Sequence, residues 1–504
     1  MISHPSHPLK EHKMRPIQIS RQDYLDRVYA CWLGKNIGGT LGAPTEGRKE
    51  LLNLSFYDPI PDKSAANDDL DLQLVWLEML RERGVYPTLT DFADYWKMHL
   101  APYPWNEYGF CQRNLARGLQ PPISGSFENY YIDEMGSPIR SEIWACVAPG
   151  DPQLAAYLAW SDSALDHAGG EGMYGEMFWA AVESAAFVLQ EPMELIRIGL
   201  DMIPTHSLIA RSIREAVWCY ENDIDWKEAR NRIIHNFANS QPCNAIANHG
   251  FTILGWLYGK DYGDKLCTAV NCGYDTDCTG ATLGSLLGIL GGVKAIPDKW
   301  REPIGEGIVL HPYTFNLNTG KTVTELTQRT AEVAEKMVEE RSDCVKFADT
   351  NKRPDNLLSL LHRNDKALLA LSRDPESAII VKDGLEIALH FGVQPVIRPN
   401  IDKIVGISVH VDDLPVPFDA QLTVPEGWSA EPVNSLFGQT RFKLNTASPD
   451  DRNILRVAVK AAHKSVDADF TILGPGEAKG YGAGNNVPTC PKCHARVEAC
   501  ICPK

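Results

Sequence analysis

The first two thirds of the chain follow the spacing of apolar residues that is typical of helices. From Asp23 to about Arg341 the pattern is helical, and Leu25, Val28, Tyr29, Trp32 and Leu33 follow the spacing that gives one apolar helical face. Clusters of proline and glycine, as at 102–104 and 121–125, interrupt the pattern and predict loops. The segments of helical length are 70–80, 175–189, 208–220, 245–257 and 322–340. The pattern predicts an all-helical domain over residues 20–343.

Beyond Arg373 the pattern changes to short β-branched runs separated by proline, glycine or aspartate. These runs are 378–381, 385–391, 404–411, 421–424, 441–444 and 454–459. Such a rhythm predicts a small all-β sandwich over residues 376–475. Residues 344–375 are interpreted as a linker, to which 357–371 could add a helix. The chain is therefore expected to be multidomain, with an all-α domain followed by the sandwich.

The length and the composition fit this division. A chain of 504 residues exceeds one ordinary domain, and 44% hydrophobic with 23% charged residues is a normal globular composition. The formal net charge of -16 argues against a nucleic-acid partner, which would require a basic surface. The first twenty residues lack the apolar core of a secretory signal, and no apolar run reaches the length of a transmembrane helix. A cytoplasmic protein without a membrane partner is expected, and its oligomeric state stays open.

An acidic pair marks the start of the helix predicted at 70–80. Asn67, Asp68 and Asp69 stand together where a loop enters an apolar helix. Adjacent carboxylates repel each other, so outside a metal site the pair is costly unless water solvates it. The alternative is an ordinary helix start, in which Asn67 caps the helix and the carboxylates favour its dipole. The motif alone does not decide between the two.

A second acidic motif comes before a helix that is rich in glycine. Asp275 and Asp277 stand two positions apart in a turn flanked by glycine, so both carboxylates can face one cation. Gly280, Gly284 and Gly288 then recur every four residues and leave a bare helical face that another helix can approach closely. The alternative is a surface turn before a capped, tightly packed helix.

A glycine-rich run after the first helix delivers Glu46, although a flexible loop with an exposed glutamate is the alternative interpretation. Taken in order, this loop glutamate, the Asn-Asp-Asp triplet and the Gly-x-Asp-Thr-Asp turn resemble the ADP-ribosylglycohydrolase family. The pair Asp166-His167, and Trp300 after the glycine-rich helix, add to the resemblance. It covers the chain from about Asp23 to Glu340.

The resemblance implies an all-α orthogonal helical bundle with two Mg²⁺ or Mn²⁺ ions in a central cleft. Hard cations prefer carboxylate oxygens, and two of them can bind vicinal ribose hydroxyls while polarising a water. The implied catalytic residues are Glu46, Asp68 and Asp277. The implied substrate contacts are His167 and, in a loosely matching loop, Gly136 and Ser137. The implied metal ligands are Asn67, Asp68, Asp69, Asp275, Asp277 and Cys278.

Two positions depart from the family pattern. Asn67 replaces a threonine but still offers an amide oxygen, whereas Cys278 replaces a threonine ligand with a thiol, which is a poor partner for magnesium. Either Thr279 supplies the oxygen, one metal position is weakened, or a softer metal is used. The substrate loop before Arg140 also matches only loosely, so the exact substrate stays open.

The implied function is metal-dependent hydrolysis of the glycosidic bond in an ADP-ribosyl or related ribosyl substrate, either a small molecule or an ADP-ribosylated partner. Cleavage at the anomeric carbon passes through an oxocarbenium-like centre that carboxylates stabilise. Glu46 or a metal-bound carboxylate is the expected base for water. One alternative is a hydrolase of a different small N- or O-glycoside or nucleoside. Another is a non-catalytic ligand-binding protein of the same fold, against which the convergence of the acidic residues argues.

A short segment of the predicted sandwich, 424–432, resembles Pro-x-Gly-Trp segments of sandwich modules attached to glycoside-processing enzymes. One interpretation is a module that presents substrate or a partner near the cleft. The other is a module that only packs against the helical domain. The resemblance favours the glycoside alternative.

Four cysteines close the sequence. Cys490, Cys493, Cys500 and Cys502 form a Cys-x2-Cys pair and a Cys-x-Cys pair within residues 485–504. Four sulfurs at this spacing suit a tetrahedral zinc knuckle, because so short a tail has few other means of folding. A thiol-rich tail without metal and a pair of disulfides are the alternatives.

Overall fold

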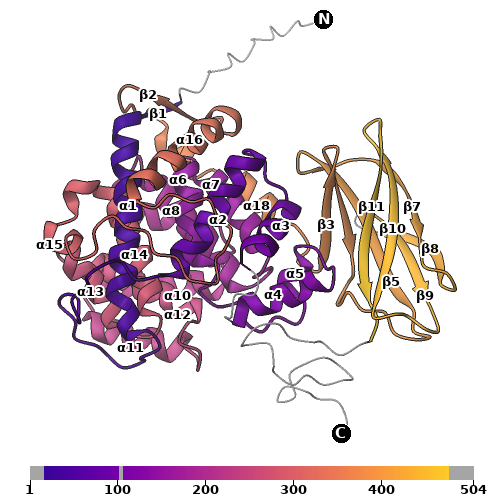
Figure 1. Ribbon diagram of the computed structural model, residues 1–504, viewed down its shortest axis with the longest axis horizontal. Coiled ribbons are helices and arrows are strands. Elements are labelled where there is room, and N and C mark those ends of the chain that lie inside the picture. Colours follow the sequence, from indigo (N-terminus) through magenta and orange to yellow (C-terminus); the bar gives the residue numbers. More distant parts are fainter. Residues whose placement is uncertain (1–15, 101–105, 437, 476–504) are drawn as a thin grey trace, which may run out of the picture.

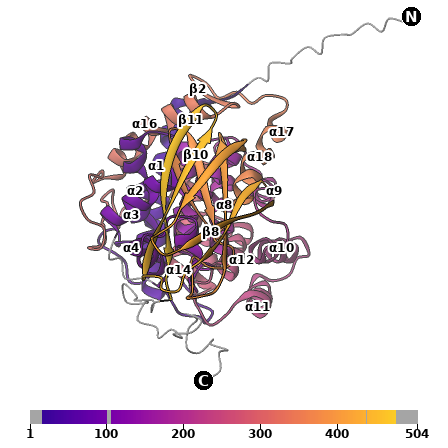
Figure 2. The same ribbon diagram turned by 90° about the vertical axis from the view of Figure 1, so that its right-hand side faces the viewer.

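The computed structural model describes residues 16–100, 106–436 and 438–475. A body of helices occupies most of this range, and two antiparallel sheets lie at one end of it (Figure 1). Figure 2, turned by 90°, shows these strands in front of the helices. The predicted order, an all-helical part followed by an all-β part, is confirmed. The cysteines of the predicted zinc knuckle, Cys490, Cys493, Cys500 and Cys502, lie outside the described residues.

Helices form the part of the chain in which the sequence predicts them. In chain order they are α1 (Arg21–Gly42), α2 (Asp68–Arg83), α3 (Leu89–His99), α4 (Asn106–Ala116), α5 (Ile123–Ser126), α6 (Ser141–Val147), α7 (Pro152–Ser163), α8 (Glu171–Ala186), α9 (Pro192–Asp201), α10 (Leu208–Glu221), α11 (Trp226–Phe237), α12 (Ala245–Tyr258), α13 (Tyr262–Asn271), α14 (Thr276–Gly291), α15 (Asp298–Arg301) and α16 (Val323–Arg341). Short 3-10 turns are η1 (Ala43–Thr45), η2 (Pro138–Arg140) and η3 (Val293–Ala295). The predicted segments correspond to α2, α8, α10, α12 and α16, whereas the loop predicted at 121–125 is partly helical because α5 begins there. Within the described ranges, no helix has both the length and the apolar character needed to cross a membrane.

Helices α1 and α14 pack against each other along a seam of glycines. A Cβ atom on Gly38 would lie 1.9 Å from the carbonyl oxygen of Gly280, and one on Gly34 would lie 2.1 Å from that of Gly284. The bare face predicted on α14 is therefore filled by the backbone of α1, whose own glycines also recur every four residues. At the end of the seam, Thr276 Oγ1 donates a 2.8 Å hydrogen bond to the carbonyl oxygen of Gly42. The seam thus fixes the end of α1 beside the start of α14.

The C-terminal strands form two antiparallel sheets around one apolar core. The strands are β3 (Ser377–Lys382), β4 (Leu385–His390), β5 (Lys403–Val411), β6 (Leu414–Pro415), β7 (Phe418–Thr423), β8 (Ser429–Leu436), β9 (Gln439–Asn445), β10 (Arg452–Ala461) and β11 (Lys464–Leu473). One sheet has the order β3-β4-β5-β9-β8, with β6 paired to β5, and the other has the order β11-β10-β7. Alternate residues such as Ile387, Val457 and Phe470 fill the space between them. The sequence pattern misses β6, β8 and β11.

The segment interpreted as a linker, 344–375, takes part in the helical body. Its first residues form β2 (Val345–Ala348), which pairs in parallel with β1 (Ile17–Ser20) near the start of the described chain. It continues into two short helices, α17 (Leu357–Leu361) and α18 (Asp365–Leu371), where the sequence predicts one. One face of each helix is buried in the core of the helical body, through Leu357, Leu360, Leu361, Ala367 and Ala370. This packing ties the β-region to the helices.

His362, between α17 and α18, links this segment to α9. Its Nδ1 lies 2.6 Å from an oxygen of Asp201, and its Nε2 lies 2.8 Å from an oxygen of Glu194. Although burial alone would lower it, these two carboxylates raise the pKa of His362 above its ordinary value. The protonated ring therefore stabilises the fold fully below the unfolded-state pKa of about 6.5, and this stabilisation is lost as the pH rises through the raised folded-state pKa.

Replacing His362 with asparagine is expected to lower the melting temperature more at pH 6 than at pH 9. The reason is that only the protonated ring gains from both carboxylates, and partial exposure limits the gain to about 1 kcal/mol or less. Thermal unfolding followed by circular dichroism at the two pH values measures the difference. His235→Asn, at an exposed position of α11, is the control. An equal loss at both pH values in the His362 variant would contradict the assignment.

Candidate metal centre

The two acidic motifs meet at the first turns of α2 and α14. One ligand atom each from Asp69, Asp277 and Cys278 lies within 4.8 Å of the other two. All three side chains are buried, and Asp275 is buried beside them at the N-cap of α14. The α1–α14 seam and the start of α2 therefore bring together residues that are about 200 positions apart in the sequence.

The carboxylates of this centre have buried oxygens without partners. Four of these oxygens have no hydrogen-bond partner among the described residues. They are both oxygens of Asp69, Oδ1 of Asp275 and Oδ1 of Asp277. Burial first, and then the neighbouring carboxylates, raise the pKa of Asp275 to about 7 and that of Asp277 well above its ordinary value. Buried anions that crowd together are costly unless a cation neutralises them. The donor set therefore fits divalent cations that prefer oxygen ligands.

Asn67 acts as the helix cap that the sequence offered as an alternative. Its Oδ1 accepts a 2.8 Å hydrogen bond from the backbone N–H of Asp69. Its side-chain nitrogen lies against Gly39, where a Cβ atom would approach it to 2.3 Å. This geometry gives Asn67 a structural role at the start of α2 and orients Asp69 toward α14.

Glu46 follows η1 and lies at the rim of the centre. Its side chain is exposed, unlike those of the aspartates. Desolvation by the surrounding protein, and then the charge of Asp69, raise the pKa of Glu46, which His311 opposes. The same His311 approaches Asp71, whose Oδ2 accepts a 2.9 Å hydrogen bond from the His311 backbone N–H and lies 3.2 Å from its Nδ1. The sequence motifs do not indicate that Asp71 and His311 lie beside the centre.

A buried lysine pairs with one of the carboxylates of the centre. Lys35 Nζ donates a 2.8 Å hydrogen bond to Glu142 Oε1 and lies 3.7 Å from Asp69 Oδ1. Although burial alone would lower it, Glu142 and Asp69 hold the pKa of Lys35 above its ordinary value, so the side chain stays charged. Gln73 donates to the backbone oxygen of Asp69 and to Glu142, at 2.6 and 2.8 Å. The sequence could have indicated this network only through the rarity of a lysine within a buried helix.

Comparison with known proteins decides the family. The ADP-ribosylglycohydrolase family model matches residues 20–343, more than half of the chain. The chain belongs to the ADP-ribosylglycohydrolase family. It is 26% identical over 284 residues to an uncharacterized protein of Archaeoglobus fulgidus, an alignment that covers 54% of this chain and 89% of the relative. A solved structure titled ADP-ribosylglycohydrolase-related protein complex aligns with 63% of this chain and 99% of its own, at 19% identity and a TM-score of 0.40.

In this member of the ADP-ribosylglycohydrolase family, Cys278 stands at the position of a threonine ligand, and either its thiol or the hydroxyl of Thr279 could replace that ligand. Cys278 belongs to the group of converging ligand atoms, beside Asp69 and Asp277. Thr279, by contrast, is fully buried, and its hydroxyl donates a 3.3 Å hydrogen bond to the backbone oxygen of Thr276 in its own helix. The geometry therefore places the side chain of Cys278, rather than that of Thr279, among the converging ligand atoms.

Replacing Cys278 with threonine is expected to shift the metal preference of the protein toward Mg²⁺. A hydroxyl oxygen is a harder ligand than a thiol and suits Mg²⁺ better than the wild-type side chain does. Affinity for Mg²⁺ relative to Mn²⁺, measured by calorimetric titration of metal-stripped protein, should rise by roughly tenfold. Cys272→Thr, at a buried cysteine that follows α13, provides the control. An unchanged ratio in the Cys278 variant would place the thiol outside the coordination sphere.

The residues predicted to contact substrate are buried around Arg140. His167 has no exposed surface, and its Nδ1 lies 3.1 Å from Asp166, which binds the guanidinium of Arg140 through both oxygens. Ser137 is equally buried and donates a 2.5 Å hydrogen bond to Glu176. Both side chains thus contact carboxylates that pair with Arg140, as the anionic surroundings of a buried guanidinium require, and their contact with substrate stays a prediction.

Gly136 is the member of the predicted substrate loop that connects to the centre. Its carbonyl oxygen accepts a 2.7 Å hydrogen bond from Arg140 and a 3.3 Å hydrogen bond from the hydroxyl of Tyr108. The same hydroxyl lies 3.4 Å from Asp68 Oδ2. The loop therefore reaches the acidic motif through its backbone and Tyr108.

Proposed function

We propose that this chain is a metal-dependent hydrolase that cleaves the bond at the anomeric carbon of an ADP-ribosyl or related ribosyl substrate. The observation that carries the proposal is the set of buried oxygens of Asp69, Asp275 and Asp277 that accept no hydrogen bond from the described residues, which suits hard divalent cations. Membership of the ADP-ribosylglycohydrolase family supports the class of reaction. Two Mg²⁺ or Mn²⁺ ions bound there would hold vicinal ribose hydroxyls and lower the pKa of a water.

The side chains that would hold these ions come from both acidic motifs. Asp68 and Asp69 start α2, and Asp275 and Asp277 start α14, so the ligands would come from two helices whose first turns both contact α1. Lys35 supplies an internal positive charge behind Asp69, which leaves the opposite side of this carboxylate for a cation. Rigid placement of ligands favours a defined coordination geometry.

Glu46 is the proposed proton acceptor for the attacking water. Its side chain is exposed, and its raised pKa brings it closer to the range in which a carboxylate accepts protons effectively. The buried aspartates would stabilise the positive charge that develops at the anomeric carbon. A Glu46→Gln protein with undiminished turnover would remove Glu46 from this role.

The proposal is tested by turnover on metal-stripped protein before and after Mg²⁺ or Mn²⁺ is restored. The substrate panel contains ADP-ribosyl-arginine, ADP-ribosyl-serine, free nucleosides and simple glycosides. Restored cleavage of an ADP-ribosyl substrate is the expected result. Cleavage of another glycoside alone would keep the metal chemistry and replace the substrate, and metal binding without any turnover would indicate a non-catalytic binding protein.

A further inference from the structure

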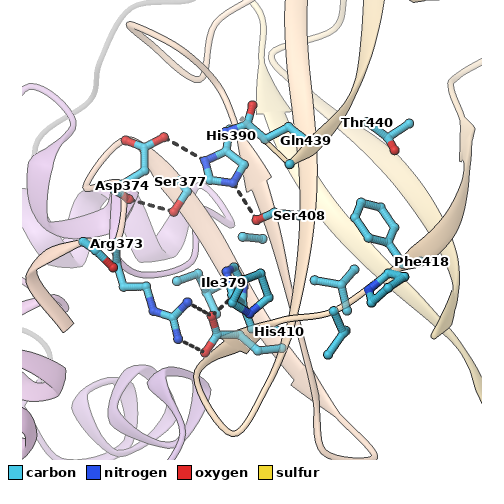
Figure 3. A pocket seen from close by; sticks show the side chains of 18 of the residues that line it. Arg373, Asp374, Ser377, Ile379, His390, Ser408, His410, Phe418, Gln439 and Thr440 are labelled. Atoms are coloured by element: carbon cyan, nitrogen blue, oxygen red, sulfur yellow. Dashed lines mark hydrogen bonds and ion pairs between the residues drawn. The ribbon is translucent and has the colours of Figure 1, made fainter. Parts of the chain in front are cut away.

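A cavity of about 740 Å³ with a mixed polar and apolar lining lies on the outer face of the larger sheet, away from the acidic motifs. The inner face of β4 and β5 carries Ile387, Leu389 and Val409, which fill the core between the two sheets. The opposite face carries His390 and Ser408, and residues that precede β3 close the cavity from the side of the helical body (Figure 3). Its volume is in the range of small-molecule sites.

Three side chains in this cavity form a continuous hydrogen-bonded chain. Ser408 Oγ lies 2.9 Å from His390 Nε2, and His390 Nδ1 lies 2.8 Å from Asp374 Oδ2 (Figure 3). The sheet register produces this arrangement, because His390 stands opposite Gly406, two residues before Ser408 on the same face. The two side chains are therefore diagonal neighbours on one face of the sheet, close enough for the hydrogen bond.

The carboxylate of Asp374 sets the direction of the two hydrogen bonds that join Asp374, His390 and Ser408. Although burial alone would raise it, the hydrogen bonds from His390 and from the backbone N–H of Glu376 hold the pKa of Asp374 below its ordinary value. An ionised carboxylate only accepts hydrogen bonds, so His390 Nδ1 carries the proton. In the neutral ring, Nε2 is then the acceptor for the hydroxyl of Ser408. This is the orientation that a serine nucleophile and its base require.

We infer that the cavity is a second catalytic site, in which Ser408, His390 and Asp374 hydrolyse a short-chain carboxylic ester of a polar alcohol. The oxygen of Ser408 bonds to the ester carbonyl carbon while its proton moves to His390 Nε2, and the carbonyl electron pair shifts to the carbonyl oxygen. That pair returns as the ester C–O bond breaks, and the leaving alcohol takes the proton from His390. Water then repeats the step on the acyl-serine, releases the acid and restores the serine.

The lining supports a short acyl group on a polar alcohol. Arg373 pairs with Glu386 at 3.0 Å and with Asp413 at 2.8 Å. Arg373 and Glu386 therefore give one side of the cavity a charged lining. Gln439 also lines the cavity, and continuing the β5–β9 register by one step places it opposite Ser408. Its side-chain amide makes no hydrogen bond within the described part of the chain, so it is an available donor for the developing oxyanion.

The test uses a fluorophosphonate probe, which modifies serines that a neighbouring base activates. Full-length protein treated with chelator is incubated with the probe, and mass spectrometry of peptides locates the adduct. The expected result is one adduct on Ser408, lost in Ser408→Ala and formed at least about 100-fold more slowly in Asp374→Asn. Ser435 is the matched control, because it lines the same cavity and is more exposed but has no histidine partner among the described residues.

The inference is overturned if folded wild-type protein gives no adduct on Ser408. It is also overturned if Ser435 reacts as fast as Ser408, or if Asp374→Asn reacts at the wild-type rate. Hydrolysis of p-nitrophenyl acetate gives a second measurement, in which Gln439→Ala should lower kcat by about 100-fold with the fold unchanged by circular dichroism. Because the chelator removes the cations of the acidic centre, either outcome is independent of the proposed glycoside hydrolysis.

Discussion

Replacing Asp277 with asparagine is expected to lower metal-dependent turnover by about 1,000-fold, because a divalent cation supplies several kcal/mol of transition-state stabilisation and each 1.4 kcal/mol is tenfold in rate. The carboxylate of Asp277 is buried, lies in the converging group with Asp69 and Cys278, and has one oxygen without a hydrogen-bond partner. Asparagine keeps the shape but removes the charge that holds the cation.

The stability of the same variant separates this effect from misfolding. Burial and the neighbouring Asp275, Glu46 and Asp69 raise the pKa of Asp277, so the ionised carboxylate opposes folding at neutral pH when no cation is present. Metal-stripped Asp277→Asn should therefore melt at or above the wild-type temperature. Asp225→Asn, at the N-cap of the exposed helix α11, should leave turnover unchanged. A variant that loses turnover only because it melts far below the wild type would contradict the assignment.

Replacing Gly38 with alanine is expected to have the largest effect on stability, a loss of about 3 kcal/mol. The added Cβ atom would lie 1.9 Å from the carbonyl oxygen of Gly280, and both atoms belong to helical backbone that cannot move alone. Separating α1 from α14 would also move the end of α1 away from Thr276 and disturb the acidic centre.

Thermal unfolding of the helical signal, followed by circular dichroism, measures this loss. Gly307→Ala is the matched control, because a Cβ atom there would meet nothing within 4 Å. The control should change the free energy of unfolding by less than about 0.5 kcal/mol. If Gly38→Ala melts with the control and keeps its metal affinity, the close contact between the two helices does not hold the centre together.

Local patterns in the sequence predict most of the elements but not how they meet. The sequence predicts α2, α8, α10, α12 and α16, because each is a segment of helical length that is mostly rich in helix formers. Strand β8 is missed because nearly all of its side chains are exposed, so it lacks the alternation of a half-buried strand. The glycines of α14 predict a close helix, but only the fold identifies α1 as that helix.

The residues of the candidate centre, too, could be predicted from the sequence only in part. The order of the acidic motifs indicates a metal site, whereas the pairing of Asp71 with His311 joins positions 240 residues apart and leaves no local signal. His167 and Ser137 match the family pattern, yet they contact Asp166 and Glu176, the carboxylates that a buried Arg140 needs as acceptors. Sequence alone does not show which polar residues face a cleft and which satisfy a buried charge.

The measurement that tests the central claim most directly is calorimetric titration of metal-stripped protein with Mn²⁺ at neutral pH. The account predicts saturable binding of two ions per chain, weakened at least tenfold in Asp277→Asn and in Asp69→Asn, and unchanged in Asp225→Asn. Cleavage at residue 475 removes the cysteine tail and so excludes its contribution to the stoichiometry. Absence of binding, or binding that both variants at the acidic centre leave unchanged, would contradict the claim that these carboxylates form a metal site.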